Sequence, residues 1–131
     1  MDELSESDLR QFTGGDVRYR HAFNRAAIYT EGVQFLAERG GAYWLIDEIA
    51  IHLGSSAFRE AAKHDERICL MHFWKLAVNA DRSAELTARA DSPDEPFIRE
   101  QIPFTDFPLD EADIWAAHDT ENWVLLLPSE Y

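Results

Sequence analysis

The spacing of apolar residues divides the chain into a helical first half and a strand-rich second half. The clearest helical pattern runs over 42–53, where Leu45, Ile49 and Leu53 recur four residues apart and polar residues occupy the other face. Shorter helices are predicted at 5–10, where Ser5 and Asp8 resemble a capping box, at 30–38 behind a Thr30 N-cap, and at 58–63. The stretch 18–27 fits neither period cleanly and stays ambiguous.

From Arg67 the apolar period changes to two. His72, Trp74 and Leu76 share one face of a strand predicted over 67–78, and both of its faces are largely apolar. This pattern indicates a central strand covered on both sides, in which Cys69 is a small buried residue.

Further strands are predicted at 84–89, 97–102, 114–118 and 123–127, the last two forming a hairpin around 119–122, with a loop at 91–96 and an ordered connection at 103–111. The chain is therefore expected to form a single α+β domain over 1–131. Its N-terminal helices would pack on an antiparallel sheet of about five strands.

Charge changes this picture more than composition does. Lys and Arg number 12 against 25 Asp and Glu, giving a net charge of −13. Residues 81–131 hold 3 basic and 13 acidic side chains, a net charge of −10. Such a surface repels nucleic acid and anionic membranes, so direct binding to either is not expected. Solubility is the plain explanation of the charge, and binding to a basic or nucleic-acid-binding protein is the functional one.

The chain has 131 residues, no apolar run of membrane-spanning length, an acidic start unlike a signal peptide, and one cysteine. These features predict a cytoplasmic protein. An internal disulfide and a multi-cysteine zinc site are excluded.

Five blocks of sequence in this order are familiar together: Gln11–Gly14, Ile28–Val33, Gly41–Ala50, Ile102–Leu109 and Leu127–Tyr131. Their combination resembles a family of small uncharacterised bacterial proteins, often associated with plasmids or phages and classed as a domain of unknown function. The resemblance covers nearly the whole chain. It implies a bacterial protein of the mobile gene pool and carries over no activity, cofactor or catalytic residue.

The segment 18–25 is the one locally basic island. Arg18, Arg20 and Arg25 could clamp a phosphate or carboxylate, and His21 adds a titratable group beside aromatic residues. The alternative is that these arginines neutralise acidic groups of the same molecule. If the protein binds a small anionic ligand or is a small enzyme, this segment is the predicted site.

The densest carboxylate cluster comprises Asp106, Asp110, Glu111 and Asp113. It lacks the twelve-residue calcium-loop pattern with its central glycine, so a solvated loop or a partner-binding surface is the better interpretation.

Glu48 and His52 lie one turn apart on the clearest helix and could bind a divalent metal together. Two ligands are too few, so a surface pair is favoured and no metal or cofactor is expected. His72, on the apolar face of the central strand, is interpreted as a structural histidine.

These observations favour binding over catalysis, because no catalytic constellation accompanies the acidic surface. The expected function is that of an acidic accessory protein of a mobile genetic element. It would act by protein–protein contact, in the sharper form as a nucleic-acid mimic. The alternatives are a small enzyme or ligand binder using Arg18–Arg25, and an oligomeric module, since a homodimer could cover the second face of the sheet.

Overall fold

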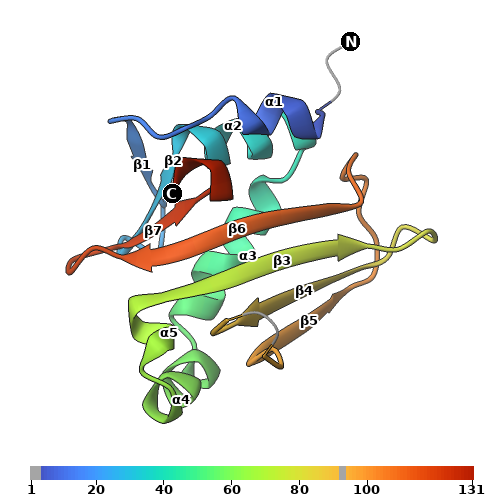
Figure 1. The fold of residues 1–131 in the computed structure, drawn as a ribbon. Helices are drawn as coiled ribbons and strands as arrows, with labels where there is room; N and C mark the ends of the chain where they lie inside the picture. The colour runs from blue at the N-terminus through green and yellow to red at the C-terminus, as the bar shows by residue number, and fades with distance from the viewer. Residues whose placement is uncertain (1–3, 92–93) are drawn as a thin grey trace.

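In the computed structural model, which describes residues 4–91 and 94–131, the longer helices lie against one face and the lower end of a seven-stranded sheet (Figure 1). The helices are α1 (Glu6–Arg10), α2 (Glu31–Gly40), α3 (Tyr43–Leu53), α4 (Ser56–His64), α5 (Arg67–Leu70) and the C-terminal 3-10 turn η1 (Pro128–Glu130). The strands are β1 (Arg18–Arg20), β2 (Ala27–Thr30), β3 (Met71–Val78), β4 (Ala84–Arg89), β5 (Ile98–Ile102), β6 (Glu111–His118) and β7 (Trp123–Leu126).

The α+β class is confirmed, but the sheet differs from the prediction in size and direction. Its order is β1-β2-β7-β6-β3-β4-β5, and β2 runs parallel to β7 while the other pairs are antiparallel. The two unpredicted strands are β1, which lies inside the ambiguous stretch 18–27, and β2, which begins at its last residue and ends at the Thr30 cap. All three residues of β1 are exposed, and β2 has only four residues, so neither shows the alternation that marks a half-buried strand. The prediction of about five antiparallel strands was wrong for this reason.

The predicted helices form where their caps and apolar stripes place them. The Thr30 hydroxyl accepts the backbone N–H of Val33 at 3.2 Å and starts α2, and Gly41 ends it in the left-handed region at φ 61°. Leu45, Ile49 and Leu53 are buried on α3, as their spacing predicts. In Figure 1, α2 and α3 lie behind the sheet, with α4 and α5 at its lower end. Within the described part of the chain, every helix is too short or too polar to cross a bilayer.

The long strand expected over 67–78 begins four residues late. The Asp65 carboxylate accepts the backbone N–H of Arg67 at 3.1 Å and also binds its guanidinium, which favours a helical turn over an extended chain at this point. The turn, α5, buries Ile68 but leaves Cys69 exposed. The interpretation of Cys69 as a buried residue was therefore wrong.

Beyond this turn, β3 shows the predicted alternation. His72, Trp74 and Leu76 are buried against the helices, while Phe73 and Lys75 are half-buried on the opposite face. The expectation that both faces are covered holds only in part, because the helices cover one face and the C-terminal turn reaches a part of the other. One side of β3 therefore lies in the core, and the other is partly exposed to solvent.

Glu130 fixes the C-terminal turn to the start of α2. Its carboxylate accepts hydrogen bonds from the Thr30 hydroxyl at 2.5 Å and from the backbone N–H of Gly32 at 3.1 Å. A Cβ at Gly32 would lie 2.7 Å from this carboxylate, so only glycine permits the close approach. A negative charge at a helix N-terminus is favourable, so this contact holds η1 against the domain.

His72 is the buried titratable group at the centre of the core. Its Nδ1 lies 3.1 Å from the Ile68 carbonyl oxygen, and the ring is surrounded by aromatic side chains, those of Phe58, Trp74, Phe97 and Trp123. Burial lowers the pKa of His72 from 6.5 to about 4, because an imidazolium would be desolvated there. The structural role expected for this histidine agrees with these contacts.

His72 makes the stability of the fold depend on pH. Because its pKa is lowered from 6.5 to about 4, the unfolded chain binds the proton first, and this contribution to stability is complete above pH 6.5 and is lost as the pH falls toward 4. We expect the wild-type free energy of unfolding to fall across this interval by up to about 3 kcal/mol more than that of His72→Phe. Urea denaturation at a series of pH values measures both. Parallel curves for the two proteins would contradict the prediction.

Candidate functional site

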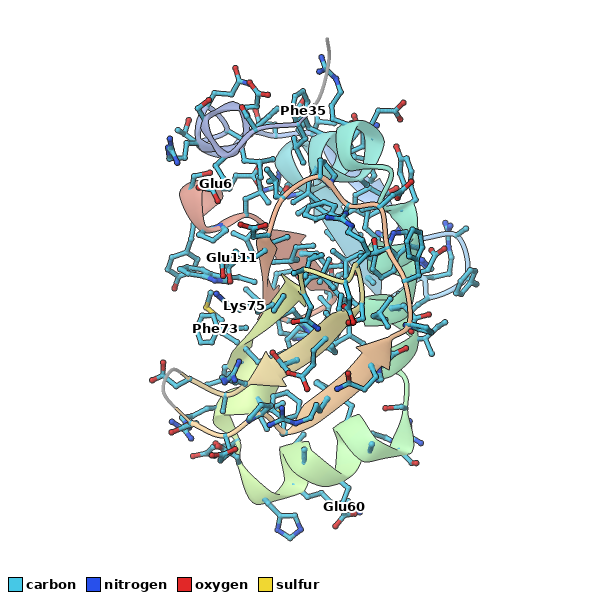
Figure 2. The ribbon with its side chains drawn as sticks, turned by 90° about the vertical axis from the view of Figure 1, so that its right-hand side faces the viewer. Glu6, Phe35, Glu60, Phe73, Lys75 and Glu111 are labelled. Carbon is cyan, nitrogen blue, oxygen red and sulfur yellow. The ribbon has the colours of Figure 1, made fainter. Side chains whose placement is uncertain are left out.

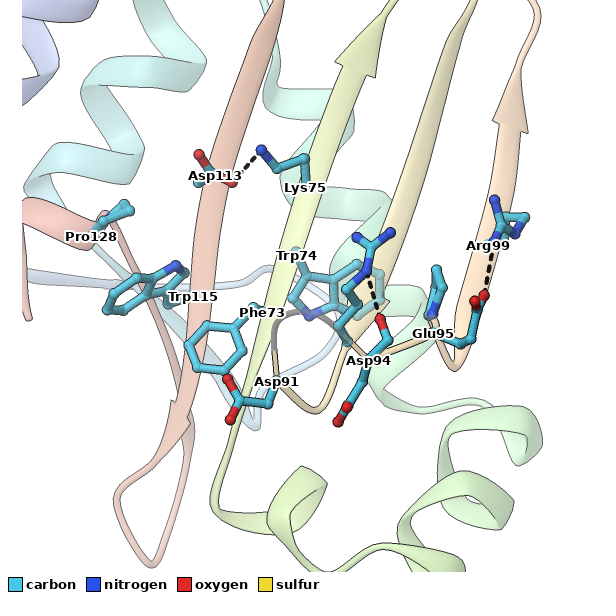
Figure 3. A pocket seen from close by; sticks show the side chains of 12 residues that line it. Phe73, Trp74, Lys75, Asp91, Asp94, Glu95, Arg99, Asp113, Trp115 and Pro128 are labelled. Carbon is cyan, nitrogen blue, oxygen red and sulfur yellow. Dashed lines mark hydrogen bonds and ion pairs between the residues drawn. The ribbon is translucent and has the colours of Figure 1, made fainter.

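The face of the sheet opposite α3 carries a groove of about 890 Å³. We call it the sheet groove. Its described lining comes from β3, β4, β5, β6, the β4–β5 loop and the C-terminal turn: Phe73, Trp74, Lys75, Arg89, Asp91, Asp94, Glu95, Pro96, Arg99, Asp113, Trp115 and Pro128. Figure 3 shows these side chains from close by. Ser92 and Pro93 of the loop expected at 91–96 lie outside the described residues.

Strand register places the lining side chains in cross-strand rows. One row joins Trp115, Phe73 and Arg89 across β6, β3 and β4. The next row contains Asp113, Lys75, Thr87 and Arg99, and the row after it Glu111, Ala77, Glu85 and Gln101. Directly opposed side chains on one face of a sheet are neighbours, so the register alone creates an aromatic row followed by charged rows.

The aromatic row forms the apolar end of the groove. The rings of Phe73 and Trp115 meet edge to face with centroids 5.2 Å apart, and Tyr131 packs on Trp115 at 5.5 Å. Both Phe73 and Trp115 remain partly exposed, and Tyr131 is 76 % exposed. A partly exposed aromatic cluster in a concave surface is a common anchor for a partner protein.

Lys75 stands between two carboxylates at the centre of the groove. Its Nζ lies 2.9 Å from Glu111 Oε1 and 3.5 Å from Asp113 Oδ1, so the three groups carry a net charge of −1. Figure 3 shows the contact with Asp113. The hydrogen bond to Glu111 and the charges of both acids raise the pKa of Lys75 above its usual value. Figure 2 shows Lys75 and Glu111 together along one side of the molecule.

Arg99 repeats this arrangement on the edge strand. Its guanidinium lies 2.9 Å from Glu85 Oε2 and 3.9 Å from Glu95 Oε1, again one cation between two carboxylates. The hydrogen bond from Arg99 lowers the pKa of Glu85. Arg89 differs, because it donates to neutral oxygens, the Asp94 carbonyl at 3.0 Å and the Thr87 hydroxyl at 3.1 Å. Taken together, the two charged rows hold three carboxylates against the two cations Lys75 and Arg99, a net charge of −1.

The acidic cluster predicted from the sequence divides between two places. Glu111 and Asp113 lie on β6, where both contact Lys75, and Asp113 also lines the groove. Asp106 and Asp110 lie exposed on the connection between β5 and β6. Of the four predicted partner-binding residues, Asp113 thus lines the groove and Glu111 contacts its Lys75.

The basic island at 18–25 is held by contacts within the chain. Arg18 donates to the Gly15 carbonyl oxygen at 2.6 Å, and Arg20 to that of Arg25 at 2.5 Å. The acceptors of Arg20 also include the Asn122 side chain at 3.0 Å, and Arg25 donates to the His21 carbonyl oxygen at 3.4 Å. Within the described part of the chain these arginines therefore bind neutral oxygens, and the ion pairs with acidic groups expected for them are not formed there.

His21 is buried beneath this island. Its Nδ1 accepts the backbone N–H of Asn24 at 3.1 Å, which leaves Nε2 to donate to Asp47 Oδ1 at 2.8 Å. Both ring nitrogens have partners in the chain, so His21 serves to connect the β1–β2 turn to α3.

Sequence reasoning missed most of the groove. Phe73, Arg89, Arg99 and Trp115 are separated by up to 42 residues and form no local motif. The sequence signal that could have indicated the groove is the set of residues on the face of the alternating strands that points away from the core. The outward positions of the strand at 71–78 and of that at 111–118 are aromatic and charged, but only their pairing register brings them together.

The chain belongs to a family of unknown function, DUF6876, whose model matches residues 3–131. This confirms the resemblance to an uncharacterised family that covers nearly the whole chain. No curated protein and no solved structure matches the chain.

Removing the central cation of the groove tests its electrostatic role. In Lys75→Met, Glu111 and Asp113 face each other without Nζ between them, so we expect a loss of about 0.5–1 kcal/mol in the free energy of unfolding at low salt, and a smaller loss at high salt. Urea denaturation at both salt concentrations measures this effect. The control is Lys63→Met, because Lys63 is exposed on α4 with Glu60 at 4.0 Å and should change little. Equal losses in the two variants, or no salt dependence, would contradict the prediction.

Proposed function

We propose that the protein is a non-catalytic accessory protein that binds a basic segment of a partner protein in the sheet groove. The observation that carries this proposal is the row of Phe73 and Trp115 beside rows in which two carboxylates flank each of Lys75 and Arg99. The aromatic rings offer apolar contact area, and the carboxylates select cationic side chains.

Charge supports a basic occupant. Residues 81–131 carry a net charge of −10, and the groove is built largely from this part of the chain. A field of this sign attracts a basic protein at long range and speeds its association. It also disfavours a second copy of this chain, whose identical face would bring like charges together.

A nucleic-acid-binding protein is the partner class that this chemistry fits best, because such proteins present basic surface to phosphates. In this sharper form of the proposal, the groove face and its neighbouring carboxylates occupy that surface in place of nucleic acid. The bacterial and mobile-element setting implied by the family resemblance is part of the same proposal, since a plasmid or phage gains from controlling a host protein that acts on DNA.

The proposal is tested by comparing matched surface variants as bait in a bacterial lysate. Phe73→Ser/Trp115→Ser removes the aromatic row, and Phe23→Ser/Ile51→Ser removes two exposed apolar side chains outside the groove lining, 65 % and 54 % exposed. We expect a basic partner to be retained by the wild type and by the second variant. Its binding to the first variant should fall by about tenfold or more, as when aromatic anchors are lost. Capture should also weaken between about 50 mM and about 500 mM salt, because screening shortens the reach of the carboxylates.

Loss of capture with the Phe23/Ile51 variant, or retention with the Phe73/Trp115 variant, would refute the groove as the binding surface. Light scattering of the wild-type protein measures whether a second copy of the chain binds in the groove instead. A stable dimer that the Phe73/Trp115 variant converts to monomer would assign this face to a second copy instead.

A further inference from the structure

We propose that Glu48, His52 and Glu100 form a binding site for a divalent transition-metal ion between α3 and β5. This site lies on the helix-facing side of the sheet, whereas the sheet groove lies on the other, so the inference does not depend on the proposed function.

Two elements bring the three side chains together. Glu48 and His52 are one turn apart on α3, so both project from one face of the helix. Glu100 lies between Ile98 and Ile102 on β5 and pairs with the buried Leu86, so its side chain belongs to the helix-facing side. The Glu100 carboxylate contacts His52 of α3 from this side of the edge strand.

The distances between the three side chains allow them to bind the same ion. His52 Nε2 lies 2.6 Å from Glu100 Oε1, and one ligand atom from each of the three residues lies within 4.8 Å of the others. Ligand atoms about 2.1 Å from a tetrahedral ion are roughly 3.4 Å apart, so only small side-chain movements would admit one. The side chains of His52 and Glu100 are 22 % and 30 % exposed, which shields the cluster in part and leaves solvent access for water ligands.

The charges of the cluster call for a cation. Glu48 and Glu100 lie close enough to hydrogen-bond each other, and burial together with this neighbour raises the pKa of Glu48. Among the described residues, no Lys or Arg forms an ion pair with either carboxylate, and His52 is the only basic group beside them. Two carboxylates held together without a strong cation are costly, and a divalent ion between them removes that cost.

The donor set indicates the class of ion. One imidazole nitrogen and two carboxylate oxygens suit Zn²⁺, Fe²⁺ or Mn²⁺ better than Ca²⁺ or Mg²⁺, which prefer oxygen ligands alone. The His52 ring packs against Trp74 with centroids 5.6 Å apart, which restrains the imidazole. Trp74 is 1 % exposed, and its Nε1 has no hydrogen-bond partner among the described residues. The side chain that packs on His52 therefore carries an unsatisfied hydrogen-bond donor.

The chain contains a matched control for this site. Glu60 and His64 on α4 have the same four-residue spacing and lie 3.1 Å apart, but both are exposed and no third ligand completes them within the described residues. Figure 2 shows Glu60 at the far end of the molecule. If any Glu–His pair on a helix bound metal, both pairs would bind it. If a third ligand is needed, only the pair beside Glu100 binds metal.

The test is calorimetric titration of the full, EDTA-treated protein with ZnCl₂ and with MnCl₂, together with thermal unfolding with and without each ion. We expect one ion per chain, with Zn²⁺ bound more tightly than Mn²⁺. The melting temperature of the wild type should rise with metal, as binding to the folded state requires. Glu48→Gln, His52→Gln and Glu100→Gln should each weaken binding by about tenfold or more, and Glu60→Gln/His64→Gln should bind as the wild type does.

Glu48→Gln separates loss of the site from loss of the fold. It removes one of two adjacent carboxylates, so the metal-free variant should unfold at the wild-type temperature or above it while its metal-dependent rise disappears. Absence of Zn²⁺ and Mn²⁺ binding to the wild type at millimolar concentration would overturn the proposal. Binding that survives Glu48→Gln and Glu100→Gln, or that is lost in the Glu60/His64 control, would do the same.

Discussion

The two-sided alternation of β3 is the constraint on which the rest of the structure depends. One side of this central strand supplies Trp74 and Leu76 to the core beneath α3, and the other supplies Phe73 and Lys75 to the sheet groove. Because side chains alternate strictly along a strand, a shift of register by one residue would exchange the two sets and destroy both surfaces at once. The packing of the core therefore also fixes the side chains that line the groove.

Ion pairs between neighbouring side chains offset part of the repulsion that the net charge of the chain creates. The chain carries a net charge of −13, yet Lys75 and Arg99 each lie between two carboxylates. This arrangement reduces repulsion within the domain while leaving each group net negative. Among the described residues, the cluster of Glu48, His52 and Glu100 has no basic side chain other than the histidine, and the proposed metal site rests on this difference.

The two proposals use different parts of one architecture. The groove is an open surface formed by the register of four strands, suited to a partner that approaches from solvent. The proposed metal site is a partly shielded contact between a helix and an edge strand, where an ion would hold β5 against α3. This member of a family of unknown function thus has two surfaces whose chemistry can be tested independently.

The sequence by itself determined the local elements and the class of the fold. Apolar spacing, the Thr30 cap and the alternation after His72 are properties of neighbouring residues, so α2, α3 and the strands from β3 to β7 were predictable within a few positions. The tertiary structure decided what depends on distant pairing. The parallel contact of β2 with β7, the meeting of Phe73 with Trp115, and the addition of Glu100 to Glu48 and His52 join residues far apart in the chain. No local period encodes such contacts, because they arise from strand register and from the packing of a helix on a sheet.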